Sequence, residues 1–227
     1  MTPLRVVVVG VGTEIGKTHV AVALVAAAAR RGVAVAGLKP VESGVGAGPT
    51  DAKRLAAASL FHVKQPPYAF PEPVSPHLAA ERAGQRIVLP RIRRWVDAHP
   101  AELVVVETAG ALLSPLGRRL TNLDLAVSLR PDVLVLVASD RLGVLHDVRA
   151  TLTPLRAALP ETPVHVVLSA PRRADASTGT NAGELRRLQV APAEHVFPRA
   201  SLVSRETREV ADALLTGIFA RPRAPRR

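Results

Sequence analysis

The residues with the clearest chemical potential lie near the N-terminus. There, a β-branched run leads into a glycine-bearing turn that ends in Gly16, Lys17 and Thr18. Residues 19–31 are nearly all Ala, Val and Leu and predict a helix. A strand, a glycine-rich loop and a helix in this order are typical of a phosphate-binding loop, whose backbone N–H groups and helix dipole face the phosphates. Lys17 would reach the β- and γ-phosphates and the Thr18 hydroxyl would coordinate Mg²⁺. We therefore expect a nucleoside triphosphate to bind here.

The loop departs from the common phosphate-loop pattern in one place. That pattern has a glycine at position 11, where this chain has Val11 between Gly10 and Gly12. A glycine-rich turn with an incidental Lys-Thr is the alternative interpretation, but the strand before it and the helix after it favour phosphate binding. The sequence therefore predicts a variant loop.

Composition and charge exclude several other kinds of protein. We place one domain at 1–220 and expect 221–227 to be a basic, disordered tail. Apolar runs are too short for a membrane span or an export signal, and the absence of cysteine excludes disulfides and thiolate metal sites, so we expect a cytoplasmic location. The net charge of +11 comes from scattered arginines with few aromatics, so we expect no specific nucleic acid partner and no membrane partner.

Apolar strands alternate with helices along the chain, which predicts an α/β fold, a three-layer sandwich with a mostly parallel central sheet. The strand signals lie at 4–10, 33–38, 103–107, 133–138, 163–168 and 195–197. The helical stretches are 17–31, 51–60, 89–98, 119–129, 144–158, 182–188 and 205–219. Residues 65–77 carry five prolines and predict irregular coil, with His77 opening a helix.

Polar residues follow the predicted strands at the edge where such sheets bind ligands. Lys39 could place an ammonium beside the phosphates opposite Lys17, although a surface lysine at a strand end is the alternative. Glu107 ends a buried strand and suggests a Mg²⁺ ligand, because Mg²⁺ takes one or two carboxylates plus phosphate oxygens. Asp51 is a second candidate carboxylate, but Thr50-Asp51 fits a plain helix N-cap equally well.

Taken together, these residues resemble the dethiobiotin synthetase family, the ATP-dependent carboxylase-cyclases of biotin biosynthesis. The resemblance covers roughly residues 4–170 and is weaker beyond them. It rests on the loop at 10–18, on Lys-Pro-Val-Glu-Ser-Gly at 39–44, on Thr50-Asp51, and on 68–77, which ends in Pro-Val-Ser-Pro-His. The family's loop also has its first glycine one place early, which accounts for Val11.

The resemblance implies a P-loop fold, a homodimer and a C–N bond-forming ligase. In the implied reaction CO₂ joins the two amines of 7,8-diaminononanoate through a carbamate, which ATP phosphorylates before ring closure. By position, Lys17 and Lys39 are the implied catalytic residues, and Thr18, Asp51 and Glu107 the implied Mg²⁺ ligands. The implied nucleotide contacts are Glu14, Ile15, Gly16, Lys17, Thr18, His19, Glu107, Thr108, Ala109, Gly110, Ser169 and Ala170. The implied substrate contacts are Thr13, Ser43, Gly143 and Val144, the last two at a helix start contributed by the second subunit.

Three segments depart from the family pattern. The family usually has Glu-Gly-Ala-Gly-Gly, whereas Thr108 and Ala111 here would crowd a close approach of backbone to phosphate. Ser169-Ala170 replaces an Asn-Asp pair whose amide reads the nucleotide base. His146-Asp147 replaces an Asn-His pair, and a carboxylate there would be unfavourable near the substrate carboxylate unless it points away. Nucleotide preference and substrate fit therefore stay open.

Other functions also stay open at this point. A divergent paralogue would keep the chemistry but act on another amine or carboxylate. A P-loop ATPase switch that binds partners or DNA would share the fold, but those switches carry a signature lysine where this chain has Gly12. An inactive copy is the remaining alternative, because of the substitutions at 108, 111 and 169–170.

Overall fold

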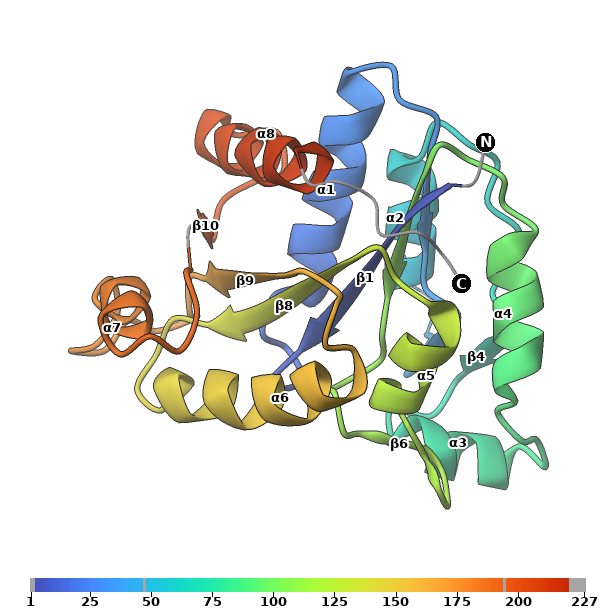
Figure 1. The fold of residues 1–227 in the computed structure, drawn as a ribbon. Helices are drawn as coiled ribbons and strands as arrows, with labels where there is room; N and C mark the ends of the chain where they lie inside the picture. The colour runs from blue at the N-terminus through green and yellow to red at the C-terminus, as the bar shows by residue number, and fades with distance from the viewer. Residues whose placement is uncertain (1–2, 47, 194, 221–227) are drawn as a thin grey trace.

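The computed structural model describes residues 3–46, 48–193 and 195–220. A six-stranded sheet runs through the middle of the molecule in the order β10-β9-β8-β1-β5-β2, and every neighbouring pair is parallel (Figure 1). In chain order the strands are β1 (Leu4–Gly10), β2 (Val35–Leu38), β5 (Leu103–Glu107), β8 (Val133–Ser139), β9 (Val164–Ser169) and β10 (His195–Phe197). The predicted α/β fold is confirmed. The tail expected at 221–227 lies outside the described residues.

Helices cover both faces of this sheet (Figure 1). One face carries α1 (Lys17–Arg30), α2 (Asp51–Ala58) and α8 (Arg205–Phe219). The other carries α4 (Leu89–Asp97), α5 (Asn122–Leu129) and α6 (Val144–Ala158), with α7 (Asn181–Arg187) packed against α6. None of the helices in the described ranges is long and apolar enough to cross a membrane.

The strands consist mostly of apolar residues, because both faces of the sheet are buried. In β1, Val6 and Val8 pack under α1 and α8, whereas Val7 and Val9 face the opposite helix layer. All four side chains have no exposed surface. Successive side chains of a strand point to opposite faces, so one uninterrupted valine run supplies both cores at once.

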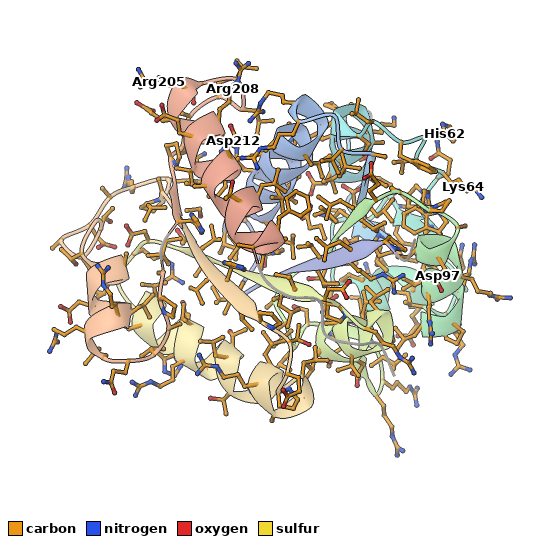
Figure 2. The ribbon with its side chains drawn as sticks, turned by 45° about the horizontal axis from the view of Figure 1, so that its top comes forward. His62, Lys64, Asp97, Arg205, Arg208 and Asp212 are labelled. Atoms are coloured by element: carbon orange, nitrogen blue, oxygen red, sulfur yellow. The ribbon has the colours of Figure 1, made fainter. Side chains whose placement is uncertain are left out.

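Charged side chains tie the helices to each other and to the sheet. Arg30, the last residue of α1, and Arg31, which follows it, lie 3.1 and 3.8 Å from the Asp212 carboxylate of α8, on the helix that Figure 2 shows at the top. The buried Arg5 guanidinium of β1 pairs at 2.6 Å with Asp97 of α4, at the opposite side of the molecule. The first pairs join α1 to α8, and the Arg5 pair joins α4 to the sheet.

Two short sheets were not foreseen in the sequence. The strands β3 (Val41–Ser43) and β4 (Tyr68–Phe70) pair in parallel, so the coil predicted at 65–77 is wrong over β4. The hairpin β6 (Pro115–Gly117) and β7 (Leu120–Thr121) takes up the start of the helix predicted at 119–129. That helix begins at Asn122 because Thr121 and Asp124 form a capping box there.

The remaining element, α3 (Pro76–Arg82), opens beside His77 as predicted. The other predicted elements are present, with bounds that differ by at most two residues at each end.

Candidate active site at the carboxyl edge of the sheet

Four side chains from different elements meet at the carboxyl edge of the sheet. Leu38 of β2 pairs with Val106 of β5, so the next residues along, Lys39 and Glu107, emerge side by side. Lys39 Nζ donates to Glu107 Oε1 at 2.9 Å and to Asp51 Oδ2 at 2.6 Å. Thr18 Oγ1 donates to the same Glu107 oxygen at 2.8 Å. The structure thus brings together Thr18, Lys39, Asp51 and Glu107, all named from the sequence as candidates.

The phosphate-binding loop connects β1 to α1 beside this cluster. Gly16 adopts φ +93°, and a Cβ there would lie 2.9 Å from Ser169 Oγ, so both conformation and space require glycine. A Cβ at Gly10 would lie 2.8 Å from the Lys17 side chain. Lys17 is buried, and its Nζ donates to Gly12 O at 2.5 Å, folded back over its own loop.

Burial and charge set the protonation of the two lysines. Burial lowers the pKa of Lys17 to about 8, and the nearby Lys39 ammonium adds to this effect against the attraction of Glu107. Burial alone would lower the pKa of Lys39 as well, but the Glu107 and Asp51 carboxylates outweigh it and raise that pKa. Lys39 is therefore a permanent cation at neutral pH, whereas Lys17 titrates just above neutrality.

The two carboxyl groups respond to the same surroundings in opposite directions. Burial raises the pKa of Glu107, and the contact with Lys39 limits the rise. Burial also acts to raise the pKa of Asp51, but the Lys39 ammonium outweighs it and lowers that pKa. Asp51 is partly open to solvent, with 32% of its side chain exposed, so it is the more readily ionised of the two.

The donor set fits Mg²⁺ bound together with a polyphosphate. Glu107 Oε2 is buried and has no hydrogen-bond partner, although Oε1 has two. With Thr18 Oγ1 and an Asp51 oxygen, it offers oxygen ligands only. The described residues hold no cluster of three or more His, Cys, Asp or Glu side chains suited to a metal. Such a partial set suits Mg²⁺, which keeps waters and shares phosphate oxygens, better than an all-protein metal cage.

A cavity of about 240 Å³ opens beside the phosphate-binding loop. Glu14, His19 and Ala170 are three of the six predicted nucleotide contacts that line it. Ser169 also borders it, but its hydroxyl donates to Ile15 O at 2.5 Å and is thus bonded to the loop. The hydroxyl that replaces the family's base-reading amide therefore supports the phosphate loop.

The segment after β5 is shaped by a residue that the sequence did not single out. Asn122 is fully buried, and its Nδ2 donates to Ala109 O at 2.5 Å and to Ala111 O at 2.9 Å. The Thr108 hydroxyl turns into the sheet and donates to Val8 O at 3.2 Å, which takes it away from the crowding we expected. Gly110 adopts φ +82°, next to Ser114. The helix predicted at 119–129 placed Asn122 inside a helix, so the sequence held no signal for this role.

The four predicted substrate contacts lie on three other segments. Thr13 is exposed in the phosphate loop, and Ser43 is half-buried at the end of β3. Gly143, with φ +92°, and Val144 begin α6 after β8. Within residues 3–46, 48–193 and 195–220, no hydrogen bond or ion pair joins these four residues to Lys39 or Glu107. Their contacts with substrate stay predictions.

The carboxylate that departs from the family pattern at α6 is neutralised locally. Asp147 pairs with Arg141 at 3.1 Å, across the turn that precedes the helix. His146 is exposed on the first turn of α6. The negative charge expected to disfavour a substrate carboxylate at this helix start is therefore partly cancelled.

Comparison with known proteins agrees with the geometry. A family model described as an AAA domain matches residues 5–207. The protein named ATP-dependent dethiobiotin synthetase BioD from Anaeromyxobacter dehalogenans (strain 2CP-C) is 37% identical over 222 residues, which cover 93% of this chain and 97% of that protein. The chain belongs to the dethiobiotin synthetase family. The resemblance that its motifs indicated is confirmed.

A further relative and a solved structure extend the comparison. The dethiobiotin synthetase of Caulobacter sp. (strain K31) is 41% identical over 163 residues, 66% of this chain and 70% of that protein. The MinC:MinD cell division protein complex of Aquifex aeolicus superposes with a TM-score of 0.57 at 11% identity, covering 98% of both chains. At that identity the likeness shows the fold alone.

Proposed function

We propose that this chain is an ATP- and Mg²⁺-dependent dethiobiotin synthetase, a ligase that closes the ureido ring of dethiobiotin from CO₂ and 7,8-diaminononanoate. The observation that supports it best is the meeting of Lys39, Asp51 and Glu107 beside the phosphate loop. In a phosphate-loop protein, a second buried lysine opposite the loop lysine provides positive charge on both sides of a transferring phosphoryl group.

The proposed reaction forms no covalent bond to the protein. One amine of the diamine captures CO₂ as a carbamate, a carbamate oxygen takes the γ-phosphoryl group of ATP, and the second amine attacks the carbonyl carbon as phosphate leaves. Lys39, held as a cation by its two carboxylate neighbours, would neutralise the carbamate and the phosphoryl oxygens. Lys17 would leave Gly12 O and bind the β- and γ-phosphates.

Thr18, Asp51 and Glu107 are the residues that would hold Mg²⁺. When bound, the ion supplies positive charge to the phosphate oxygens that develop charge in transfer. The nucleotide base would enter the cavity lined by Glu14, His19 and Ala170. Because the Ser169 hydroxyl donates to Ile15 O, it would act toward the base only as an acceptor.

The diamine would extend from Lys39 past Thr13 and Ser43. Gly143 and Val144 would meet the far end of the substrate from a second subunit, which makes a homodimer part of the proposal. The free backbone N–H groups at the start of α6 suit a carboxylate. Pairing of Asp147 with Arg141 makes that position compatible with one.

Phosphate release is the experiment that tests this function. Purified protein with Mg²⁺-ATP and bicarbonate is assayed with and without 7,8-diaminononanoate, and then with CTP and GTP. We expect release that depends on the diamine and falls by orders of magnitude in Lys17→Ala and Lys39→Ala. Nucleotide binding without diamine-dependent release would instead favour a paralogue with another substrate, or an inactive copy.

A further inference from the structure

We propose that Glu42 is a positioning residue for this site: its carboxylate holds the first turn of α2 and thereby places Asp51 against Lys39. The inference rests on the proposed role of the Lys39 cluster. It concerns a residue of β3 that our sequence analysis gave no role of its own.

Glu42 reaches across to the start of α2 with both carboxylate oxygens. Oε1 accepts the Asp51 backbone N–H at 2.7 Å, and Oε2 accepts the Ala52 backbone N–H at 3.2 Å. Only 8% of Glu42 is exposed, so the two hydrogen bonds form away from bulk water. Hydrogen bonds to an ionised acceptor are stronger than those between neutral groups, and a negative charge at a helix N-terminus is stabilised by the dipole.

Thr50 accepts the next two N–H groups of the same turn. Its hydroxyl accepts the Lys53 N–H at 3.2 Å, and its carbonyl accepts the Arg54 N–H at 3.0 Å. The first four N–H groups of a helix have no partner within it. The Arg54 bond is the first within the helix, so the Thr50 hydroxyl serves the Lys53 N–H, while Glu42, from another element, serves the first two.

The Glu42 hydrogen bonds bear on the site because Asp51 is the first residue of α2. Its backbone is held by Glu42 at 2.7 Å and its side chain by Lys39 at 2.6 Å. Lys39 and Glu42 are three residues apart in the chain, so one short segment binds both the side chain and the backbone of Asp51.

Removing the Glu42 carboxylate would leave two N–H groups without partners beside a cavity. That cavity, of about 280 Å³, is lined by Lys39, Thr50 and Ala52 among others, and has room for the helix start to shift. A shift of Asp51 would separate it from Lys39 and from Thr18 and Glu107. Partners that orient a metal ligand typically affect metal affinity about 10- to 100-fold when removed.

The test compares two caps of one helix. Glu42→Gln keeps the size of the side chain but loses one acceptor oxygen and the charge, and Glu42→Ala loses both oxygens. Thr50→Ala is the matched control, because it removes a cap from the Lys53 N–H and leaves the Asp51 and Ala52 N–H groups paired. For each variant the Tm, the Kd of Mn²⁺-ATP and the hydrogen-exchange rates of the Asp51 and Ala52 amides are measured.

We expect Glu42→Gln and Glu42→Ala to weaken Mn²⁺-ATP binding by about tenfold or more and to speed exchange at both amides. Thr50→Ala should lower the Tm comparably yet bind Mn²⁺-ATP within about twofold of the parent chain. Equal affinity in all variants would overturn the inference and leave Glu42 a helix cap only. If Glu42→Ala does not fold, the Mn²⁺-ATP affinity and amide exchange of Glu42→Gln alone test the inference.

The two proposals can fail separately. Wild-type protein that binds Mn²⁺-ATP but shows no diamine-dependent phosphate release would refute the synthetase function. The Glu42 comparison would still stand, because it is measured by metal–nucleotide binding and amide exchange without the diamine.

Discussion

Replacing Lys39 with methionine removes the cation between two carboxylates while nearly keeping the side-chain volume. Glu107 is 1% exposed, and its Oε1 lies 2.9 Å from the lost ammonium. Removing one partner of a buried ion pair typically costs about 3–5 kcal/mol, because the other charge stays buried without compensation. The half-open Asp51 contact adds at most about 1 kcal/mol. We therefore expect Lys39→Met to lose about 3–5 kcal/mol of unfolding free energy near pH 7.

Lys39→Met should also change how the unfolding free energy depends on pH. Without the ammonium, the pKa of Glu107, which burial already raises, rises further. A carboxyl group with a raised pKa in the folded state binds more protons there than in the unfolded state, so stability falls as pH rises through that pKa. The loss of unfolding free energy in Lys39→Met, relative to the parent chain, should therefore be smaller at about pH 5 than at about pH 7.

Urea unfolding of four proteins measures this: the parent chain, Lys39→Met, Glu107→Gln and the double variant. Two neutral side chains leave no unpaired charge at positions 39 and 107, so the double variant should recover most of the lost stability. Activity should stay absent in Lys39→Met and in the double variant, because the cation needed in transfer is gone. A single-variant loss below about 1 kcal/mol, or a deficit that does not change with pH, would refute the buried ion pair.

Three further predictions concern the phosphate loop. Because burial lowers the pKa of Lys17 to about 8, its charge is lost as pH rises through that value, so ATP affinity should fall between about pH 7 and about pH 9. Calorimetry near pH 8 in two buffers of different ionisation enthalpy should show proton uptake on ATP binding, and none in Lys17→Met. Ser169→Ala leaves Ile15 O without its buried donor and should cost about 1–3 kcal/mol of unfolding free energy by urea titration. In Gly16→Ala the alanine would have to adopt φ +93°, and its Cβ would lie 2.9 Å from Ser169 Oγ. We therefore expect a folded protein that no longer binds ATP in equilibrium dialysis.

Each of these has a contrary result. ATP affinity that does not change up to about pH 9 would mean that Lys17 does not titrate there or does not touch phosphate. An unfolding free energy of Ser169→Ala equal to that of the parent chain would mean that water replaces the hydroxyl as the donor to Ile15 O. Normal ATP binding by Gly16→Ala would show that the loop tolerates another conformation than the one described.

The sequence predicted the parts of the fold that have strong local signals. The valine run of β1 and the apolar strand ending in Glu107 could be identified because strands buried on both faces are nearly continuous apolar runs. The phosphate loop was visible from glycine spacing between a strand and a helix. That Lys39 and Glu107 touch depends on β2 lying beside β5, which parallel strands far apart in the chain do not reveal.

The features that were missed lack such a signal. The strands β3 and β4 have three residues each, too short for any periodicity, and they are found only through their pairing. The hydrogen bonds of Glu42 and Asn122 connect segments whose approach is set by the whole fold. The hydroxyl of Ser169 could have faced a nucleotide from its place at a strand end, and only the path of the loop shows that it bonds Ile15.

Incorporation of labelled bicarbonate into product tests the central claim most directly. The protein is incubated with Mg²⁺-ATP, ¹³C-bicarbonate and 7,8-diaminononanoate, and the products are examined by mass spectrometry. The proposed function predicts dethiobiotin carrying one ¹³C in its ureido carbon, formed with one phosphate released per molecule and absent without ATP. Phosphate release with no labelled dethiobiotin, or no release at all from a protein that binds ATP, would contradict it.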